Sequence, residues 1–287
     1  MTRECSAAVV FVIAATVLGA TDRSQRPTFS TRVESVRVDA LVTEKGQPVP
    51  GLGPADFEVF DNGVRQDVDL VRFEQLPLDV VLVLDMSDSV AGERLDHLRS
   101  ASYAMLGALA GEDRAALVTF NHAVSLGTPL TQDVAAVRSA LNLAQGSGQT
   151  ALFDGAYAAM ILGESERSRT LQLVFSDGLD TASWLTSSAV LDVAKRADIV
   201  VYAVATTGNA SAFLRDLTGF TGGSLIPIGS SGDLRSTFLH ILDEFRHRYL
   251  LSYSPRGVRG NGWHRLDVRV KHRHATVKAR PGYLAGT

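Results

Sequence analysis

Four short apolar runs, separated by segments with helical periodicity, constrain the fold of this chain more than any other feature. They lie at residues 78–84, 115–120, 171–175 and 199–205. Apolar runs without alternation are typical of parallel strands that are covered on both faces. Because these runs alternate with helical segments, they predict an α/β fold, an open and mostly parallel sheet with helices on both faces.

The helical segments have one apolar face each. Over about residues 92–110, the side chains of Leu95, Leu98, Met105 and Leu109 fall on one side of a helix. Further helices are predicted over 134–143, 153–163, 187–197, 210–217 and 234–246. Each is expected to bury its apolar face against the sheet.

Both ends of the chain are rich in strand-like sequence. Near the start, strands are predicted over 33–43, 57–60 and 64–73, with a hairpin turn at Asp61-Asn62-Gly63. Near the end, they are predicted over 249–253, 263–270 and 275–279. Since chain ends often lie close together, we expect residues 33–76 and 248–287 to form one β-rich module. The α/β domain, residues 77–247, would be inserted between them.

The first residues have the pattern of an export signal. A basic residue, Arg3, precedes an uncharged, apolar and small-residue run at 6–20, which ends in the cleavage-like pair Gly19-Ala20. The run is shorter than the about 20 residues that span a bilayer. We therefore predict a signal peptide at 1–20, a flexible leader at 21–32, and a secreted or periplasmic protein. An uncleaved anchor and a buried helix are the alternatives.

Composition excludes several classes of site. The net charge of −3 lacks the basic excess that is typical of nucleic-acid binders. The only cysteine, Cys5, lies in the predicted signal, so the mature chain would have no disulfide and no thiol ligand or nucleophile. No stretch after the signal is apolar enough to predict a transmembrane segment.

Polar residues with oxygen ligands stand at the ends of the predicted strands. Asp85, Ser87 and Ser89 follow the first apolar run, Thr150 opens a later helix, and Asp177 follows the third run. In open α/β sheets, ligands bind outside the carboxyl ends of the strands, where the strand order reverses. Hydroxyl and carboxylate oxygens suit hard divalent cations. The pattern predicts a site for Mg²⁺, or for Mn²⁺ or Ca²⁺. The alternative is that Asp85, Ser87 and Ser89 only cap the helix that begins near Gly92.

These elements resemble the metal-ion-dependent adhesion site (MIDAS) of von Willebrand factor A domains. Asp85, Ser87 and Ser89 match its first element, Thr150 its threonine, and Asp177 its second aspartate. The resemblance covers about residues 78–247, and residues 36–63 and 268–286 resemble the ends of bacterial VWFA-related domain proteins. It implies a six-stranded, Rossmann-like sheet in which the strand bearing Asp85 neighbours the strand bearing Asp177.

A MIDAS-type site favours binding over catalysis. Neutral hydroxyl ligands leave the cation much of its charge, so an acidic residue of a protein partner would complete its coordination. Asp88 and Gln149 stand where the family often has glycine, and the carboxylate of Asp88 would either raise metal affinity or repel an acidic partner. Two other functions remain open. One is a metal-dependent hydrolase, which the absence of histidine from the three motif segments disfavours. The other is a structural module of an envelope assembly.

Overall fold

The computed structural model describes residues 35–72, 76–163, 168–177, 179–206, 208, 211–258, 260–271 and 274–286. The predicted signal peptide and leader lie outside the described residues. Within them, no helix has both the length and the apolar character needed to span a bilayer.

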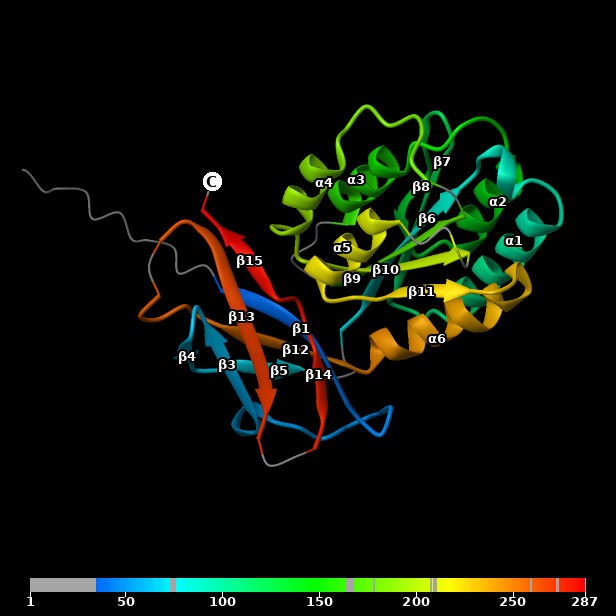
Figure 1. Ribbon diagram of the computed structural model, residues 1–287. Helices are drawn as coiled ribbons and strands as arrows, with labels where there is room; N and C mark the ends of the chain where they lie inside the picture. The colour runs from blue at the N-terminus through cyan, green and yellow to red at the C-terminus, as the bar shows by residue number, and fades with distance from the viewer. Residues whose placement is uncertain are drawn as a thin grey trace, which may run out of the picture. The chain divides into compact units, whose positions relative to one another are not determined.

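A six-stranded sheet forms the middle of the chain (Figure 1). Its strands, in spatial order, are β11 (Leu225–Ile228), β10 (Ile199–Thr206), β9 (Arg169–Ser176), β6 (Leu78–Asp85), β7 (Arg114–Phe120) and β8 (Val124–Thr131). All neighbouring pairs are parallel except β7 and β8, which are antiparallel. The predicted open, mostly parallel sheet is confirmed, and the order reverses between β6 and β9.

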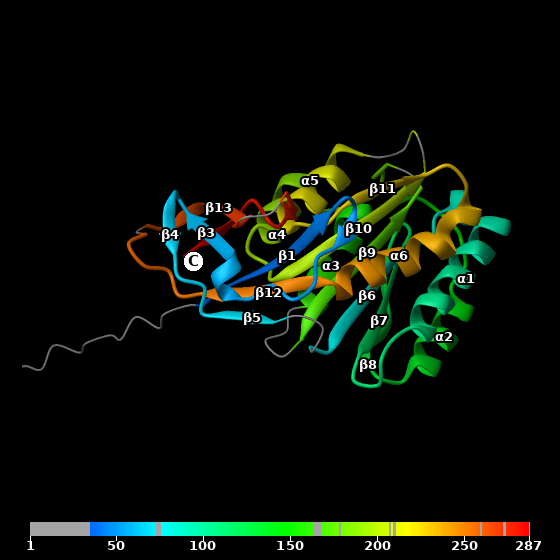
Figure 2. The same ribbon diagram turned by 90° about the horizontal axis from the view of Figure 1, so that it is seen from below.

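Helices cover both faces of this sheet, as predicted. One face carries α1 (Glu93–Gly107), α2 (Val134–Leu143) and α6 (Leu234–Arg246), and the other carries α3 (Leu152–Gly163), α4 (Ser187–Ala194) and α5 (Ala212–Thr221) (Figure 2). Successive β6 side chains point to opposite faces. Accordingly Leu82 packs in the core with α1, α2 and α6, whereas Val83 packs in the core with α3, α4 and α5.

The sheet has two strands that the apolar runs did not predict. β8 contains Gly127 and Pro129, has mostly exposed or half-buried side chains, and pairs with β7 through a bulged register. β11 is four residues long and contains Pro227. Both are edge strands, where proline is tolerated and a continuous apolar run is not needed. The predicted strand over 64–73 is divided into β4 (Val64–Gln66) and β5 (Leu70–Arg72).

Strands from both ends of the chain pair with each other. The remaining elements are β1 (Val36–Glu44), β2 (Gln47–Pro48), β3 (Phe57–Asp61), β12 (Arg248–Tyr253), β13 (Gly262–Val270), β14 (Thr276–Lys278) and β15 (Gly282–Ala285). In one sheet β1 lies between β12 and β14, and in another β13 lies between β3 and β15. Side chains of both sheets, among them Val38, Val59, Tyr249 and Leu266, share one core. We call these two sheets the β module.

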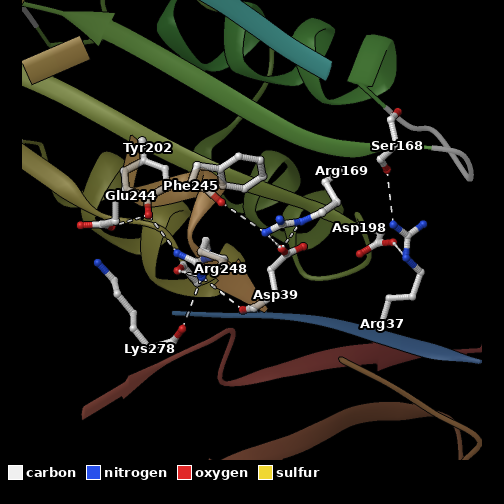
Figure 3. Close-up of polar contacts among 11 residues, drawn as sticks. Arg37, Asp39, Ser168, Arg169, Asp198, Tyr202, Glu244, Phe245, Arg248 and Lys278 are labelled. Carbon is white, nitrogen blue, oxygen red and sulfur yellow. Dashed lines mark hydrogen bonds and ion pairs between the residues drawn. The ribbon is translucent and has the colours of Figure 1, made fainter. Parts of the chain in front are cut away.

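Buried arginines connect the β module to the six-stranded sheet (Figure 3). The Nε of Arg169 donates to Oδ1 of Asp39 at 2.8 Å, and its guanidinium lies over the ring of Phe245. Arg248, which is fully buried, donates to the hydroxyl of Tyr202 at 2.9 Å and to the carbonyl of Gly222 at 2.7 Å. Arg169 is paired with a carboxylate, and Arg248 donates to neutral oxygens of several elements, so both cations link the β module to the α/β domain.

Candidate metal centre

Asp85 is the last residue of β6 and is fully buried. Its Oδ1 accepts a hydrogen bond from the backbone N–H of Ser87 at 2.9 Å, and its Oδ2 accepts one from Oγ of Ser176 at 2.7 Å. Burial raises the pKa of the Asp85 carboxyl, although the hydrogen bonds from Ser87 and Ser176 act in the opposite direction. A cation beside this carboxylate would offset the cost of burying its charge.

A chain of side-chain contacts leads from the β6 turn to Asp177. Oγ of Ser87 lies 3.1 Å from Oγ of Ser89, and Oγ of Ser89 donates to Oδ1 of Asp177 at 2.6 Å. The two aspartates approach each other because β6 pairs with β9 where the strand order reverses. The structure therefore brings four of the five predicted residues together.

Helix capping does not account for these serines. Ser87 precedes the short 3-10 helix Asp88–Val90 without a side-chain capping bond, and the N-cap of α1 is Gly92. Their hydroxyls point instead toward each other and toward Asp177.

Thr150 reaches the site through its loop. The backbone N–H of Ser147 donates to the carbonyl of Met86 at 2.8 Å, and Asp88 and Gly148 exchange two bonds. In these, the N–H of Asp88 donates to the carbonyl of Gly148 at 3.0 Å, and the N–H of Gly148 donates to Oδ1 of Asp88 at 2.8 Å. These contacts join the loop that precedes Thr150 to Met86 and Asp88, which lie between the predicted ligands Asp85 and Ser89.

Arg94 is a further residue of the site, which the pattern of oxygen ligands in the sequence did not predict. It stands in the first turn of α1, where Nη1 forms an ion pair with Oδ2 of Asp177 and donates to the carbonyl of Ser89 at 2.8 Å. No sequence pattern singles it out, because its ion pair with Asp177 arises only in the folded chain. Asp177 is thus shared between a serine hydroxyl and a guanidinium.

The donor set fits an oxygen-preferring divalent cation. Asp85 and Asp177 supply carboxylates, and Ser87, Ser89 and Thr150 supply hydroxyls. Among the side chains described, no three His, Cys, Asp or Glu residues cluster in a way that could hold a metal. Such a hydroxyl-rich set favours a hard ion over metals that prefer nitrogen or sulfur.

Comparison with known proteins settles the family. Residues 79–229 match the model of the von Willebrand factor type A domain. The chain belongs to the von Willebrand factor type A (VWA) family. A search of curated proteins finds no match.

Solved structures share the VWA fold at low sequence identity. A von Willebrand factor type A protein from Catenulispora acidiphila has a TM-score of 0.54 and 12% identity, over 85% of this chain and 75% of that one. The proximal thread matrix protein 1 from the mussel byssus, with a zinc-occupied MIDAS motif, has a TM-score of 0.55 and 14% identity. That match covers 64% of this chain and 49% of the mussel chain, so this chain spans about half of the mussel protein.

A pilus protein shares the fold as well. The vWF domain of the type V pili tip protein Mfa5 from Porphyromonas gingivalis has a TM-score of 0.50 and 14% identity, over 64% of this chain and 98% of that one.

Two further residues lie beside the site of this VWA protein. Asp88 stands where the family often has glycine, but its φ is not positive, and its carboxylate accepts a hydrogen bond from the Thr150 loop. His122, which lies outside the motif segments, stands beside the Thr150 loop. Gly148 has φ +79° there, and a Cβ on it would lie 2.7 Å from Nδ1 of His122. A residue with a Cβ at position 148 would have to displace the His122 ring and to adopt a positive φ that favours glycine.

Proposed function

We propose that this chain is an exported protein that binds a protein partner through a divalent cation, without catalysing a reaction. Asp85, Ser87, Ser89, Thr150 and Asp177 would hold Mg²⁺, or Mn²⁺ or Ca²⁺. The observation that carries the proposal is the hydrogen-bonded chain from Asp85 through the two serines to Asp177, at the reversal of strand order. The zinc-occupied MIDAS motif of the mussel protein supports it by similarity of fold.

The balance of charge argues for an acidic partner. A bound cation supplies a positive charge that three neutral hydroxyls leave uncompensated. The Asp177 carboxylate is partly engaged by Arg94, which reduces the negative charge that it offers to a cation. A carboxylate of the partner would complete the shell and provide much of the specificity.

Metal binding is tested by calorimetry with Mg²⁺ and Mn²⁺ on the whole mature protein. We expect one site of modest affinity, lost in Asp85→Asn and retained in the control Asp192→Asn, which alters an exposed carboxylate on α4. Equal binding in all three proteins would refute the site. Unfolding curves verify that each variant is folded.

Partner binding is tested by capture from envelope extract, first with Mg²⁺ and then with EDTA. We expect Thr150→Ala and EDTA each to abolish capture while the fold is retained. Capture that persists in EDTA would leave the metal a structural role and would support the alternative of a structural module.

His122 gives the hydrolase alternative a specific observation, because an imidazole beside the Thr150 loop is a possible general base. Hydrolysis of model phosphate or peptide esters that depends on Mg²⁺ and falls at least about 100-fold in His122→Ala would favour it. The absence of such activity, with partner capture intact, would support the binding function.

Export is tested by N-terminal sequencing of the native protein. We expect the mature chain to begin near Thr21 and to be found in the periplasm or the medium. A protein that keeps Met1 and stays in the cytosol would contradict this.

A further inference from the structure

The segment that follows Asp177 exposes two large apolar side chains. Trp184 is 94% exposed, the highest value among the large apolar residues described, and Leu179 is 60% exposed. We call residues 179–185 the Trp184 loop. The Trp184 indole has no role in the core and offers a large apolar area that a partner could cover.

Hydrogen bonds hold the Trp184 loop against the start of α3. The two carboxylate oxygens of Asp154 accept the backbone N–H groups of Trp184 and Leu185, each at 2.9 Å. In return, Oγ of Ser183 accepts the N–H groups of Phe153 and Asp154 at 3.0 and 3.2 Å. The exposure of Trp184 is therefore fixed by a hydrogen-bonded backbone.

The same loop is bound directly to a residue of the candidate metal site. The carbonyl of Thr150 accepts the N–H groups of Thr181 and Ala182 at 2.8 and 3.1 Å, and Oγ1 of Thr181 accepts the N–H of Thr150 at 3.0 Å. The loop that carries Trp184 therefore follows one proposed metal ligand, Asp177, and is hydrogen-bonded to another, Thr150.

We propose that the Trp184 loop is the apolar half of the partner-binding surface and that it receives an apolar side chain adjacent to the partner's metal-binding carboxylate. This inference rests on the proposed function. The occupant is a protein segment that pairs Asp or Glu with a neighbouring Leu, Phe, Tyr or Trp. Charge complementarity favours the acid at the cation, near Arg94, and the large area of the indole favours an apolar neighbour.

Tryptophan side chains that become buried at the centre of an interface commonly dominate its affinity. Removal of the indole should therefore weaken binding of an acidic and apolar peptide by about 10- to 30-fold. It should not change the binding of the metal, because the Trp184 loop is held by its backbone and by Asp154, not by the indole.

The test uses the whole mature protein and an array of synthetic peptides in Mg²⁺. Each peptide has one central Asp or Glu, flanked either by Phe or Leu or by Ser and Gly. We expect the wild type to prefer the apolar flanks, and Trp184→Ala to lose this preference while calorimetry with Mg²⁺ is unchanged. The matched control is Ile161→Ala, which removes a 52% exposed apolar side chain near the far end of α3.

Fluorescence provides an independent readout. The chain has two tryptophans, so Trp263→Phe leaves Trp184 as the only one. Peptide binding should shift the emission of this variant to shorter wavelength and protect it from acrylamide. An unchanged spectrum with bound peptide would overturn the inference.

The outcomes separate the two proposals. If acidic peptides bind in Mg²⁺ but apolar flanks and Trp184→Ala have no effect, the role of Trp184 is refuted and the metal-dependent function stands. If no acidic peptide binds, or binding persists in Asp177→Asn and in EDTA, the proposed function fails and this inference fails with it. Binding of an acidic oligosaccharide in place of every peptide would also overturn it.

Discussion

Arg169, the first residue of β9, is paired with Asp39 of β1, so the strand that leads to Asp177 is anchored at its other end to the β module. Both side chains are almost completely buried, at 3% and 11% exposure. Asp39 belongs to the β module and Arg169 to the α/β domain, so the ion pair crosses the predicted boundary between them. Four predictions follow from this relationship and from the geometry of the site.

The first prediction concerns Asp39. Asp39→Ala leaves the Arg169 guanidinium buried without its carboxylate, and we expect a loss of about 3–5 kcal/mol in the free energy of unfolding. The control is Asp67→Ala, which breaks the exposed pair with Arg256 and should cost less than about 1 kcal/mol. Urea unfolding measures both. Equal small losses would show that the buried pair does not stabilise the fold.

The second prediction concerns the α/β domain alone. A fragment of residues 77–247 keeps its two apolar cores but lacks Asp39 and the strands of the β module. We expect it to fold and bind metal with lower stability than the whole chain. Arg169→Met should recover part of the loss, because it removes the uncompensated charge. A fragment that is unfolded by circular dichroism with either residue would contradict the domain division.

The third prediction concerns Arg94. Its guanidinium competes with a cation for Asp177, so Arg94→Ala should raise the affinity for Mg²⁺ by about 5- to 20-fold, as measured by calorimetry. Arg94→Lys keeps the charge and should change the affinity less. An affinity that falls in Arg94→Ala would mean that Arg94 positions Asp177 for the metal.

The fourth prediction concerns Asp88. Asp88→Asn keeps an oxygen that can accept the N–H of Gly148 but removes the negative charge, so it should strengthen the binding of acidic peptides by a few fold. Asp88→Ala also loses the bond between the two loops and should weaken metal binding instead. If both variants behave alike, the contact with Gly148 has no role in the site.

The sequence predicted the central strands of the fold because strands that are covered on both faces need unbroken apolar runs. Leu82 and Val83 belong to an unbroken apolar run, and the structure buries them on opposite faces of the sheet. It did not predict β8, since an edge strand with Gly127 and Pro129 has no periodicity to recognise.

The residues of the candidate site also fall into those that the sequence could predict and those that it could not. Asp85 and Asp177 could be placed from sequence because each follows a recognisable strand. Arg94, His122 and the Asp154 contacts to the Trp184 loop could not, because they join segments distant along the chain that approach one another only when it folds.

β1 lies between β12 and β14 in its sheet, so it can pair on both sides only after these two strands have been synthesised. Val36 pairs with Tyr253, and Thr43 pairs with Thr276, so β12 and β14 both come from a distant part of the chain, beyond the α/β domain. Contacts so distant along the chain form slowly, because a long loop must close first. Until then β1 has only its short pairing with β2, at Thr43 and Glu44, whereas all strands of the α/β domain have already been synthesised. A chain truncated near residue 247 would therefore leave most of β1 without its partner strands, so pairing with β12 and β14 protects this protein from aggregation through the edges of β1.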